Sequence, residues 1–371
     1  MTRLQVEFRR GALTLWVLAA GCGSAAAPPH PVVAERSDSL ARELSRRFNL
    51  PGVSIAIARR DGEIWQWQIG AADLESGRRI SRETRFRVGS VSKLFTGAIA
   101  ARLAASGVLD LDAPVSRYLS AVPPAYRAVT PRLLAGHLAG VRHYRLREFE
   151  NQRSYPTVSA SLGIFLQDSL LAPPGARYSY STYGYNLLAA VLEAASERRF
   201  AMLLEEEVSR PLGLRRVMLE PSGRMADDQA LPYARDSAGR HLPARTVDLS
   251  DRWPAGGLIS SAEELARFGL GVFGSDYLPA AWREMLLTSQ RTTAGVATRV
   301  GLGWRIATDS LGRRYAHHGG ASTGGRAFLL VYPDQGVAVA ILANTEANFG
   351  EAEALAFARV ALPWGSGRPG N

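Results

Sequence analysis

Runs typical of β-strands lie near both ends of this 371-residue chain, and the stretch between them is patterned like helices. Each end carries two β-rich runs joined by a short turn, at 53–58 and 63–69 and again at 326–332 and 337–344. Asp61-Gly62 and Pro333-Asp334-Gln335-Gly336 are the turn signals within each pair. Because the strands of one sheet lie side by side, we expect the two ends of the chain to meet in a single antiparallel sheet.

Apolar residues at helical spacing predict helices outside and between these strands. They are expected at 37–48, 90–105, 183–195, 200–208 and 351–360. The expected fold class is α/β in the mixed, α+β sense, with terminal helices on one face of the sheet and a helical middle subdomain against the other. The sheet part is expected at about 35–95 and 250–365 and the helical part at about 96–249, forming one domain over 35–365.

The first residues are typical of an export signal. Arg3, Arg9 and Arg10 precede an apolar stretch, 11–21, which is too short to cross a bilayer. Small residues then lead to Cys22, the only cysteine, so the chain has no intrachain disulfide. This arrangement is similar to a bacterial lipoprotein signal, in which the cysteine is lipidated and becomes the new N-terminus.

We therefore expect a signal peptide at 1–21, a tether at 22–34 and a lipid anchor on Cys22. The anchor would hold an exported protein on a membrane, facing the periplasm or the cell exterior. An ordinary secretory signal, cut near Ala25-Ala26-Ala27, is the alternative.

The charge of the chain does not indicate a nucleic-acid partner. The formal charge is +10, but the arginines are scattered among acidic residues and form no basic stripe interleaved with aromatics. The partner expected is a small-molecule or peptide substrate, and the oligomeric state is left open.

Lys93 is the only lysine among the 44 lysines and arginines of the chain. It follows Ser90 by three residues at the start of the predicted helix 90–105, so the two side chains share one face, a turn apart. A buried lysine can lose its proton and act as a base, whereas a guanidinium stays protonated. Ser90 can thus attack an acyl carbon while Lys93 takes its proton. The alternative is a chance surface lysine on a helix.

Further segments accompany the Ser-x-x-Lys pair in a fixed order along the chain. They are Leu133–Tyr144, Pro174–Tyr185, Pro254–Ser261 and Ala316–Gly320. With Val88-Gly89-Ser90-Val91-Ser92-Lys93, this set resembles the serine β-lactamase and penicillin-binding-protein superfamily. More narrowly, it is similar to the class C β-lactamase-like serine hydrolases, a branch with esterases, D-amino-acid peptidases and a mitochondrial β-lactamase-like protein. The resemblance implies a β-lactamase/transpeptidase-like fold.

The resemblance also assigns the catalytic roles. Ser90 would be the nucleophile, Lys93 its activating partner, and Tyr180 the tyrosine that faces them and assists proton transfer. His317 would occupy the place of the lysine in the Lys-Thr-Gly motif of β-lactamases. The oxyanion hole would combine the backbone amides of Ser90 and Gly320. Tyr178, Tyr183 and Tyr185 are expected to be packing residues, and His137 and His143 to be structural or substrate-loop residues.

Two departures from the family pattern bear on the substrate. Thr182 stands where an asparagine is usual, and His317 replaces a lysine, which weakens the attraction for a substrate carboxylate at neutral pH. Thr182, His318 and Gly319 are the residues expected to bind substrate. A metal site at the histidine pair is not expected, since no carboxylate or cysteine spacing supports one, and no cofactor is expected.

The sequence thus favours a serine hydrolase that acts on ester or peptide bonds through an acyl-enzyme. One alternative is a β-lactamase or D,D-carboxypeptidase acting on β-lactams or peptidoglycan stem peptides. Another, from a different class, is a catalytically silent binding lipoprotein on the same fold.

Overall fold

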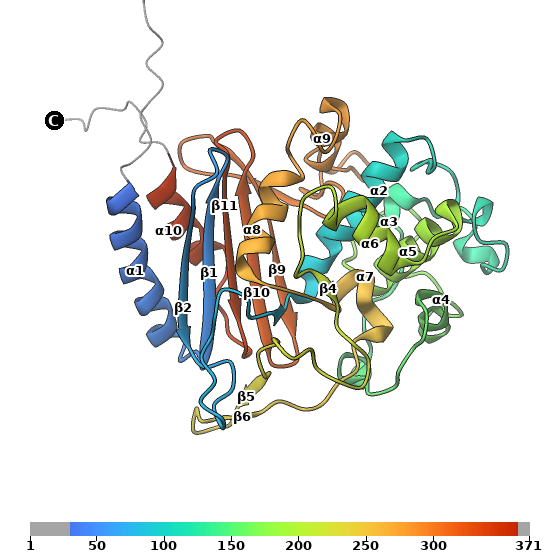
Figure 1. The fold of residues 1–371 in the computed structure, drawn as a ribbon. Coiled ribbons are helices and arrows are strands. Elements are labelled where there is room, and N and C mark those ends of the chain that lie inside the picture. Colours follow the sequence, from blue (N-terminus) through green and yellow to red (C-terminus); the bar gives the residue numbers. More distant parts are fainter. Residues whose placement is uncertain (1–29, 363–371) are drawn as a thin grey trace, which may run out of the picture.

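The computed structural model describes residues 30–362 and has one antiparallel sheet at its centre (Figure 1). The sheet has six strands in the order β2-β1-β11-β10-β9-β8. Their bounds are β1 (Gly52–Arg59), β2 (Ile64–Gly70), β8 (Arg305–Thr308), β9 (Arg314–Ser322), β10 (Gly325–Tyr332) and β11 (Val337–Ala343). β1 pairs with β11, with Ile55 opposite Ile341, so the predicted meeting of the two chain ends in one sheet is confirmed.

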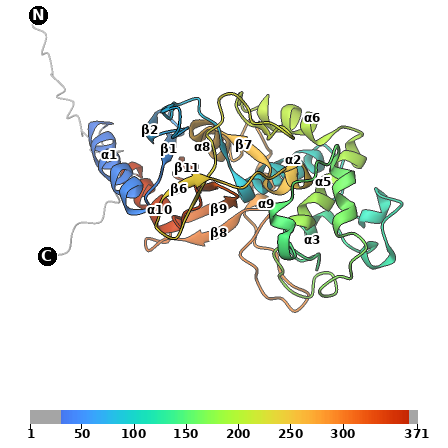
Figure 2. The same ribbon diagram turned by 90° about the horizontal axis from the view of Figure 1, so that it is seen from below.

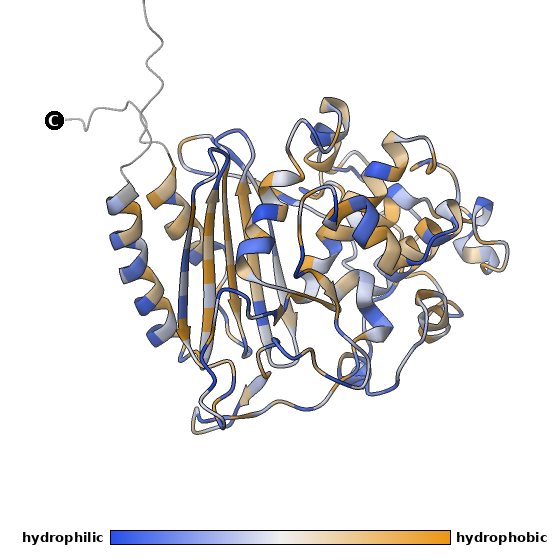
Figure 3. Ribbon diagram, in the orientation of Figure 1, coloured by the Kyte–Doolittle hydropathy of each residue, from blue (hydrophilic) through white to orange (hydrophobic). Residues whose placement is uncertain are grey.

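Alternation along the central strands separates two cores. Ile55 and Ile57 of β1 pack under α1 (His30–Arg47) and α10 (Glu351–Ala361), while Ala56 and Ala58 face α8 (Ala262–Gly271) and the helical part of the chain. Figure 3 shows both the apolar strands and the polar outer side of α1. Because both faces of the sheet are covered, its central strands are apolar on both sides.

The first helix departs from the prediction. It begins at His30 rather than near residue 37, so part of the predicted tether, 30–34, is helical. Proline is tolerated in the first helical turn, where its missing N–H has no partner to lose, and Pro31 occupies that turn. Val33 is fully buried against the sheet, which gives the added turn its hydrophobic contact. The predicted signal peptide and Cys22 lie outside the described residues.

The helical part lies beside the sheet, at the end away from α1 (Figure 2). Its helices are α2 (Ser92–Ala105), α3 (Pro131–Ala135), α4 (Val158–Ser161), α5 (Thr182–Ser196), α6 (Phe200–Leu204), α7 (Trp253–Gly256) and α9 (Ala280–Leu286). Short strands connect it to the sheet: β3 (Phe86–Arg87), β4 (Met218–Leu219) and β7 (Leu258–Ser260) form one group, and β5 (Tyr233–Arg235) and β6 (His241–Pro243) form a hairpin. Within residues 30–362, no helix is both long and apolar enough to span a bilayer.

Helix α2 lies at the junction of the sheet and the helical part. Its small residues allow close approach: a Cβ on Gly97 would lie 2.4 Å from the carbonyl oxygen of Leu302. Phe95 of α2 stacks on Phe268 of α8 with ring centroids 3.8 Å apart. Since α2 is held from several sides, its first turn is fixed relative to the edge of the sheet.

Candidate active site

Ser90 lies in a tight 3₁₀ turn, Gly89–Val91, that leads into α2. Gly89 has a φ of +50°, and a Cβ there would lie 2.6 Å from the carbonyl oxygen of Ala321 in β9. A glycine is needed on both counts, because left-handed backbone and close backbone contact each disfavour a side chain. This turn therefore places Ser90 directly against strand β9.

Lys93 points back along α2 to Ser90, as the three-residue spacing predicts. Its Nζ lies 3.1 Å from Ser90 Oγ, 2.7 Å from the carbonyl oxygen of Ala255 and 3.3 Å from Thr182 Oγ1. The side chain is fully buried, and this burial, reinforced by Arg252 and Arg305, lowers the pKa of Lys93 well below its ordinary value. A lysine in these surroundings is suited to accept a proton.

Tyr180 meets Ser90 from the opposite side. Its Oη donates a hydrogen bond of 2.8 Å to Ser90 Oγ. It precedes α5, whose N-cap Ser181 accepts from the N–H of Gly184 at 2.9 Å. Burial raises the pKa of Tyr180 above its ordinary value, so the phenol keeps its proton at neutral pH. The structure thus brings Ser90, Lys93 and Tyr180 together.

Two histidines support Tyr180 from the loop before α4. His137 lies against the Tyr180 ring, with centroids 4.4 Å apart, and its Nδ1 accepts from the N–H of Ser181 at 3.1 Å. His143 Nδ1 accepts from the N–H of Thr182 at 3.2 Å. Burial, with Lys93 and Arg252 next, lowers the pKa of His143 to about 4, so the imidazole is neutral at pH 7.

The placement predicted for His317 is wrong, because the register of β9 turns it away from Ser90. His317 lies opposite Leu330, in the core under α1 and α10, and its ring stacks on Phe328 with centroids 5.6 Å apart. His318 lies opposite Leu329, on the other face, and its ring centroid is 6.3 Å from that of Tyr180. His318, not His317, therefore occupies the place expected for the lysine of the family motif.

The same register corrects the expected oxyanion hole. N–H directions alternate along an antiparallel strand. The N–H of Ile306 in β8 donates to the carbonyl of Arg299 and so points away from β9. The N–H of the preceding residue, Arg305, therefore points toward β9. Because Arg305 pairs with His317, the N–H of His317 points back toward β8. Because the direction alternates at each residue, the N–H of Gly320 points toward β10. The N–H of Ala321 points the other way, toward the edge of β9 on the β8 side. β8 ends opposite His317, which leaves this edge open beside Ser90.

The backbone amide of Ala321, rather than that of Gly320, is therefore the one that faces Ser90. Gly320 has a different importance, since a Cβ there would lie 1.9 Å from the carbonyl oxygen of Val88. Its lack of a side chain is what allows β9 to approach the turn of Ser90.

A hollow of about 260 Å³ opens over Ser90. Thr182 and Gly319, two of the predicted substrate-binding residues, line it. His318 is not one of its lining residues, and its ring centroid lies 6.3 Å from that of Tyr180. Arg252 and Arg326 also line it, although neither was predicted from the sequence, and so does His143, which was expected to be a structural or substrate-loop residue. The remaining lining residues are Tyr144, Phe149, Gly256, Ala321 and Ser322. Arg252 could have been suspected from the sequence, because it lies just before the Pro254–Ser261 segment of the family pattern. No sequence pattern links Arg326 to Ser90.

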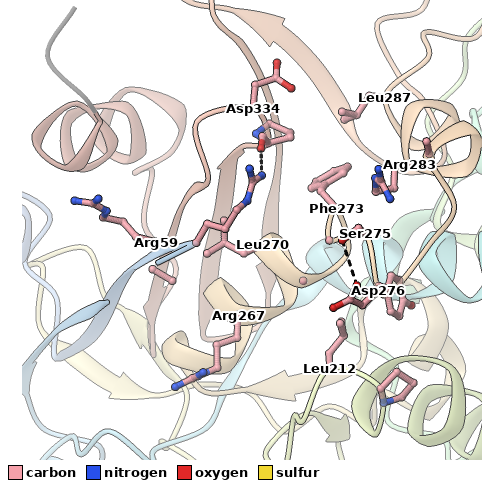
Figure 4. Close-up of a pocket in the computed structure, with 18 of the residues that line it drawn as sticks. Arg59, Leu212, Arg267, Leu270, Phe273, Ser275, Asp276, Arg283, Leu287 and Asp334 are labelled. Carbon is pink, nitrogen blue, oxygen red and sulfur yellow. Dashed lines mark hydrogen bonds between the residues drawn. The ribbon is translucent and has the colours of Figure 1, made fainter. Parts of the chain in front are cut away.

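A larger hollow, of about 1120 Å³, lies between α8, α9 and the hairpin tips (Figure 4). Its wall includes Arg59, Arg267 and Arg283 but none of the three residues gathered at Ser90. Arg59 pairs with Asp61 and Arg267 with Glu263, so most of the charge there is balanced. The smaller hollow is the candidate active site.

Comparisons with known proteins agree with this geometry. The Beta-lactamase family model matches residues 38–362. The chain is 24% identical to the mitochondrial serine beta-lactamase-like protein LACTB of Homo sapiens, over 81% of this chain and 72% of that protein. It is 30% identical to esterase EstB of Burkholderia gladioli, over 73% of this chain and 78% of that protein.

Among solved structures, the D-amino acid amidase of Ochrobactrum anthropi SV3 superposes with a TM-score of 0.74 at 19% identity, covering 89% of this chain and 96% of that one. At that identity the likeness shows the fold. The family match over most of the described residues, together with the identity to the esterase, shows that this chain is a hydrolase of the β-lactamase family.

Proposed function

We propose that this protein is a serine hydrolase that cleaves ester or peptide bonds through an acyl-enzyme on Ser90. The observation that carries the proposal is that Ser90 Oγ lies within hydrogen-bonding distance of both Lys93 Nζ and Tyr180 Oη, at 3.1 and 2.8 Å. A nucleophile between a low-pKa amine and a protonated phenol has both a base and an acid at hand.

In the proposed reaction, Ser90 Oγ bonds to the acyl carbon while its proton passes to Lys93 Nζ. The amides of Ser90 and Ala321 stabilise the negative oxygen that forms, and a missing donor of this kind typically costs about 10²–10³-fold in kcat. The bond to the leaving group then breaks, and the proton held by Lys93 is returned to the leaving group with Tyr180 assisting. Water then attacks the acyl carbon and gives a proton to Lys93 Nζ. The bond from the acyl carbon to Ser90 Oγ breaks, the proton passes from Lys93 to Oγ, and the acid is released with Ser90 restored.

The relatives support an ester or amide as substrate. One is named an esterase and another an amidase of D-amino acids, and this chain shares their family or fold. A β-lactam or a stem peptide is the second candidate, because other relatives are named penicillin-binding proteins.

The test is hydrolysis of a short-chain p-nitrophenyl ester by the full chain, beside Ser90→Ala. Turnover that is lost in the variant supports the proposal. Efficient hydrolysis of a chromogenic cephalosporin, well above that of the esters, would favour the β-lactamase alternative. If the wild type hydrolyses neither and an activated fluorophosphonate leaves Ser90 unlabelled, a silent binding protein becomes the better account.

We also propose that the protein is exported and held on a membrane by a lipid on Cys22. The support is the order of basic residues, apolar stretch and cysteine at the start of the sequence. Labelling with radioactive palmitate in a bacterial host tests it. We expect label in the wild type and none in Cys22→Ser, which should move to the soluble fraction; an unlabelled wild type would contradict the anchor.

A further inference from the structure

One wall of the catalytic hollow is a loop rather than a long helix or a strand. His143, Tyr144 and Phe149 line the hollow, and between them the chain forms a single 3₁₀ turn, Leu146–Glu150. The rings of Tyr144 and Phe149 meet edge to face with centroids 5.5 Å apart, and we call this ring pair the aromatic wall. Because a loop has few backbone hydrogen bonds of its own, side chains must fix its position.

Arg252 contacts both the backbone and the rings of the aromatic wall. Its Nη1 donates to the carbonyl of Phe149 at 3.0 Å, and its Nη2 donates to the carbonyl of Glu148 at 2.8 Å. Its guanidinium carbon lies 4.7 Å from the centre of the Tyr144 ring and 5.4 Å from that of Phe149, within the range of a cation–π contact. One side chain, only 2% exposed, thus holds this wall in place.

The guanidinium of Arg252 is itself fixed. Its Nε and Nη2 donate to the two carboxylate oxygens of Asp251 at 2.7 and 3.0 Å, and Asp251 is fully buried. Asn186 of α5 donates to the backbone carbonyl of Asp251. Since α5 begins at Thr182, two residues after Tyr180, the aromatic wall is anchored to the same helix that positions the catalytic tyrosine.

These contacts need an arginine. A guanidinium spreads five N–H donors over one plane, so it can bind both oxygens of a carboxylate and still reach two carbonyls. A lysine ammonium has three donors at a single point and cannot span the same acceptors. Arg142 holds the loop from the other side through the carboxylate of Glu148, at 2.7 and 3.0 Å, which leaves the carbonyls of Glu148 and Phe149 to Arg252.

We propose that Arg252 is a positioning residue for substrate binding, which acts by holding Tyr144 and Phe149 in the wall of the hollow. The proposal rests on the proposed function and deepens it, because it names a residue outside the reacting groups that decides how well substrate is held. A wall that is already in place spares the substrate the entropic cost of ordering it. Losing Arg252 should therefore weaken binding more than it slows the chemical step.

The test compares KM and kcat for a p-nitrophenyl ester in the wild type and in Arg252→Lys. We expect KM to rise about 10- to 100-fold, since hydrogen bonds to charged groups are of this strength, with a much smaller change in kcat. Burial first and Arg252 next lower the pKa of Lys93. Because Arg252→Lys keeps a positive charge there, the pH dependence of kcat/KM should stay as in the wild type.

Arg102→Lys is the matched control. Arg102 on α2 donates to the carboxylate of Glu207 and to the carbonyl of Tyr277, both at 2.9 Å, and lies 5.1 Å from the centre of the Tyr277 ring, outside the hollow. Its replacement should leave KM unchanged. If Arg252→Lys does not fold because Asp251 loses its partner, Asp251→Asn with Arg252→Met removes both charges together and should give the same rise in KM.

Hydrogen exchange followed by mass spectrometry, without substrate, reports on the loop directly. We expect the amides of 143–150 to exchange faster in Arg252→Lys than in the wild type or Arg102→Lys. Exchange needs no turnover, so it separates a failure of this proposal from a failure of the proposed function. Exchange at the wild-type rate would overturn the proposal. A fall in kcat at unchanged KM, or faster exchange with unchanged KM, would overturn it as well.

Discussion

Lys93 is fully buried, and no carboxylate lies within 4 Å of it in the described part of the chain. Its partners are two hydroxyls and one carbonyl, which suit a neutral amine as well as an ammonium. An ion-pair partner would hold the proton on the lysine, whereas burial and two nearby arginines weaken that hold. The surroundings of this one side chain therefore fit a base better than a structural cation.

Replacing Lys93 with arginine tests the base directly. Arg keeps the positive charge and does not give up its proton, so Lys93→Arg should lower kcat for a p-nitrophenyl ester by about 10²–10⁴-fold, the range of general-base effects. Circular dichroism should show a folded protein. Turnover near the wild-type rate would contradict the assignment.

Arg305 offers a second, pH-dependent test. Its guanidinium lies 5.9 Å from the centre of the Tyr180 ring and lowers the pKa of Lys93. Since the neutral lysine is the active form, kcat/KM should rise as pH rises through that pKa. Removing the cation in Arg305→Gln raises the pKa, so the rising limb should move to higher pH. A limb that stays in place or moves to lower pH would argue against Lys93 as the group that titrates.

At the scale of elements, the site depends on how closely β9 approaches the first turn of α2. The approach is set by glycines on both sides, Gly89 in the turn and Gly320 in the strand, where added Cβ atoms would lie under 3 Å from backbone atoms. Backbone at both contacts cannot move aside as a flexible side chain can. Separating the two elements would also separate the amides of Ser90 and Ala321.

Gly320→Ala should therefore lower both the melting temperature and kcat. Its Cβ would lie 1.9 Å from the carbonyl oxygen of Val88, and the expected loss in kcat is about 10-fold or more, up to the 10²–10³-fold cost of one oxyanion donor. Gly163→Ala is the matched control, because a Cβ there has nothing within 4 Å. If Gly320→Ala behaves like this control, the close approach is not what positions the site.

At the scale of the whole molecule, histidines that stay neutral because folding shields them from water couple folding to pH. An unfolded histidine has a pKa of about 6.5, whereas that of His143 is about 4 in the folded protein. As pH falls from 6.5 toward 4, the unfolded state binds the proton first, so stability present above pH 6.5 is lost over that window. The pKa values of His137 and His318 are also lowered, and burial is the largest cause for both.

We expect the urea midpoint of the wild type to be lower at pH 5 than at pH 7, and the difference to be smaller in His143→Gln. Equilibrium urea unfolding followed by tryptophan fluorescence measures both. Equal pH dependence in the two proteins would mean that the folded protein does not lower the pKa of His143.

The sequence predicted the large elements because their signals are local. Turn residues and alternation identify β1, β2, β10 and β11, and the Ser-x-x-Lys spacing needs only one helical turn. Strands of two or three residues, such as β3, β4 and β7, carry no such pattern and form only because the chain around them is in place. The start of α1 was missed because a proline in a first turn looks like a stop signal.

The errors at the site have one physical cause. His317 and His318 are adjacent, and a shift of one residue in a strand exchanges its two faces, so only the pairing with β10 decides which histidine faces Tyr180. The oxyanion amide was predicted at Gly320 rather than Ala321 for the same reason, because neighbouring N–H groups in a strand point to opposite edges. Arg326 reaches the hollow through its pairing opposite Ala321, a contact between strands that no spacing along the chain reveals.

The central claim is that Ser90 carries an acyl group during turnover, and rapid-quench mass spectrometry tests it most directly. Protein mixed with excess ester and quenched in acid within milliseconds should gain the mass of the acyl group, and peptide mapping should place it on Ser90. Ser90→Ala should gain none. An adduct on another residue would contradict the account. So would the absence of any adduct under conditions in which the alcohol is released in a burst.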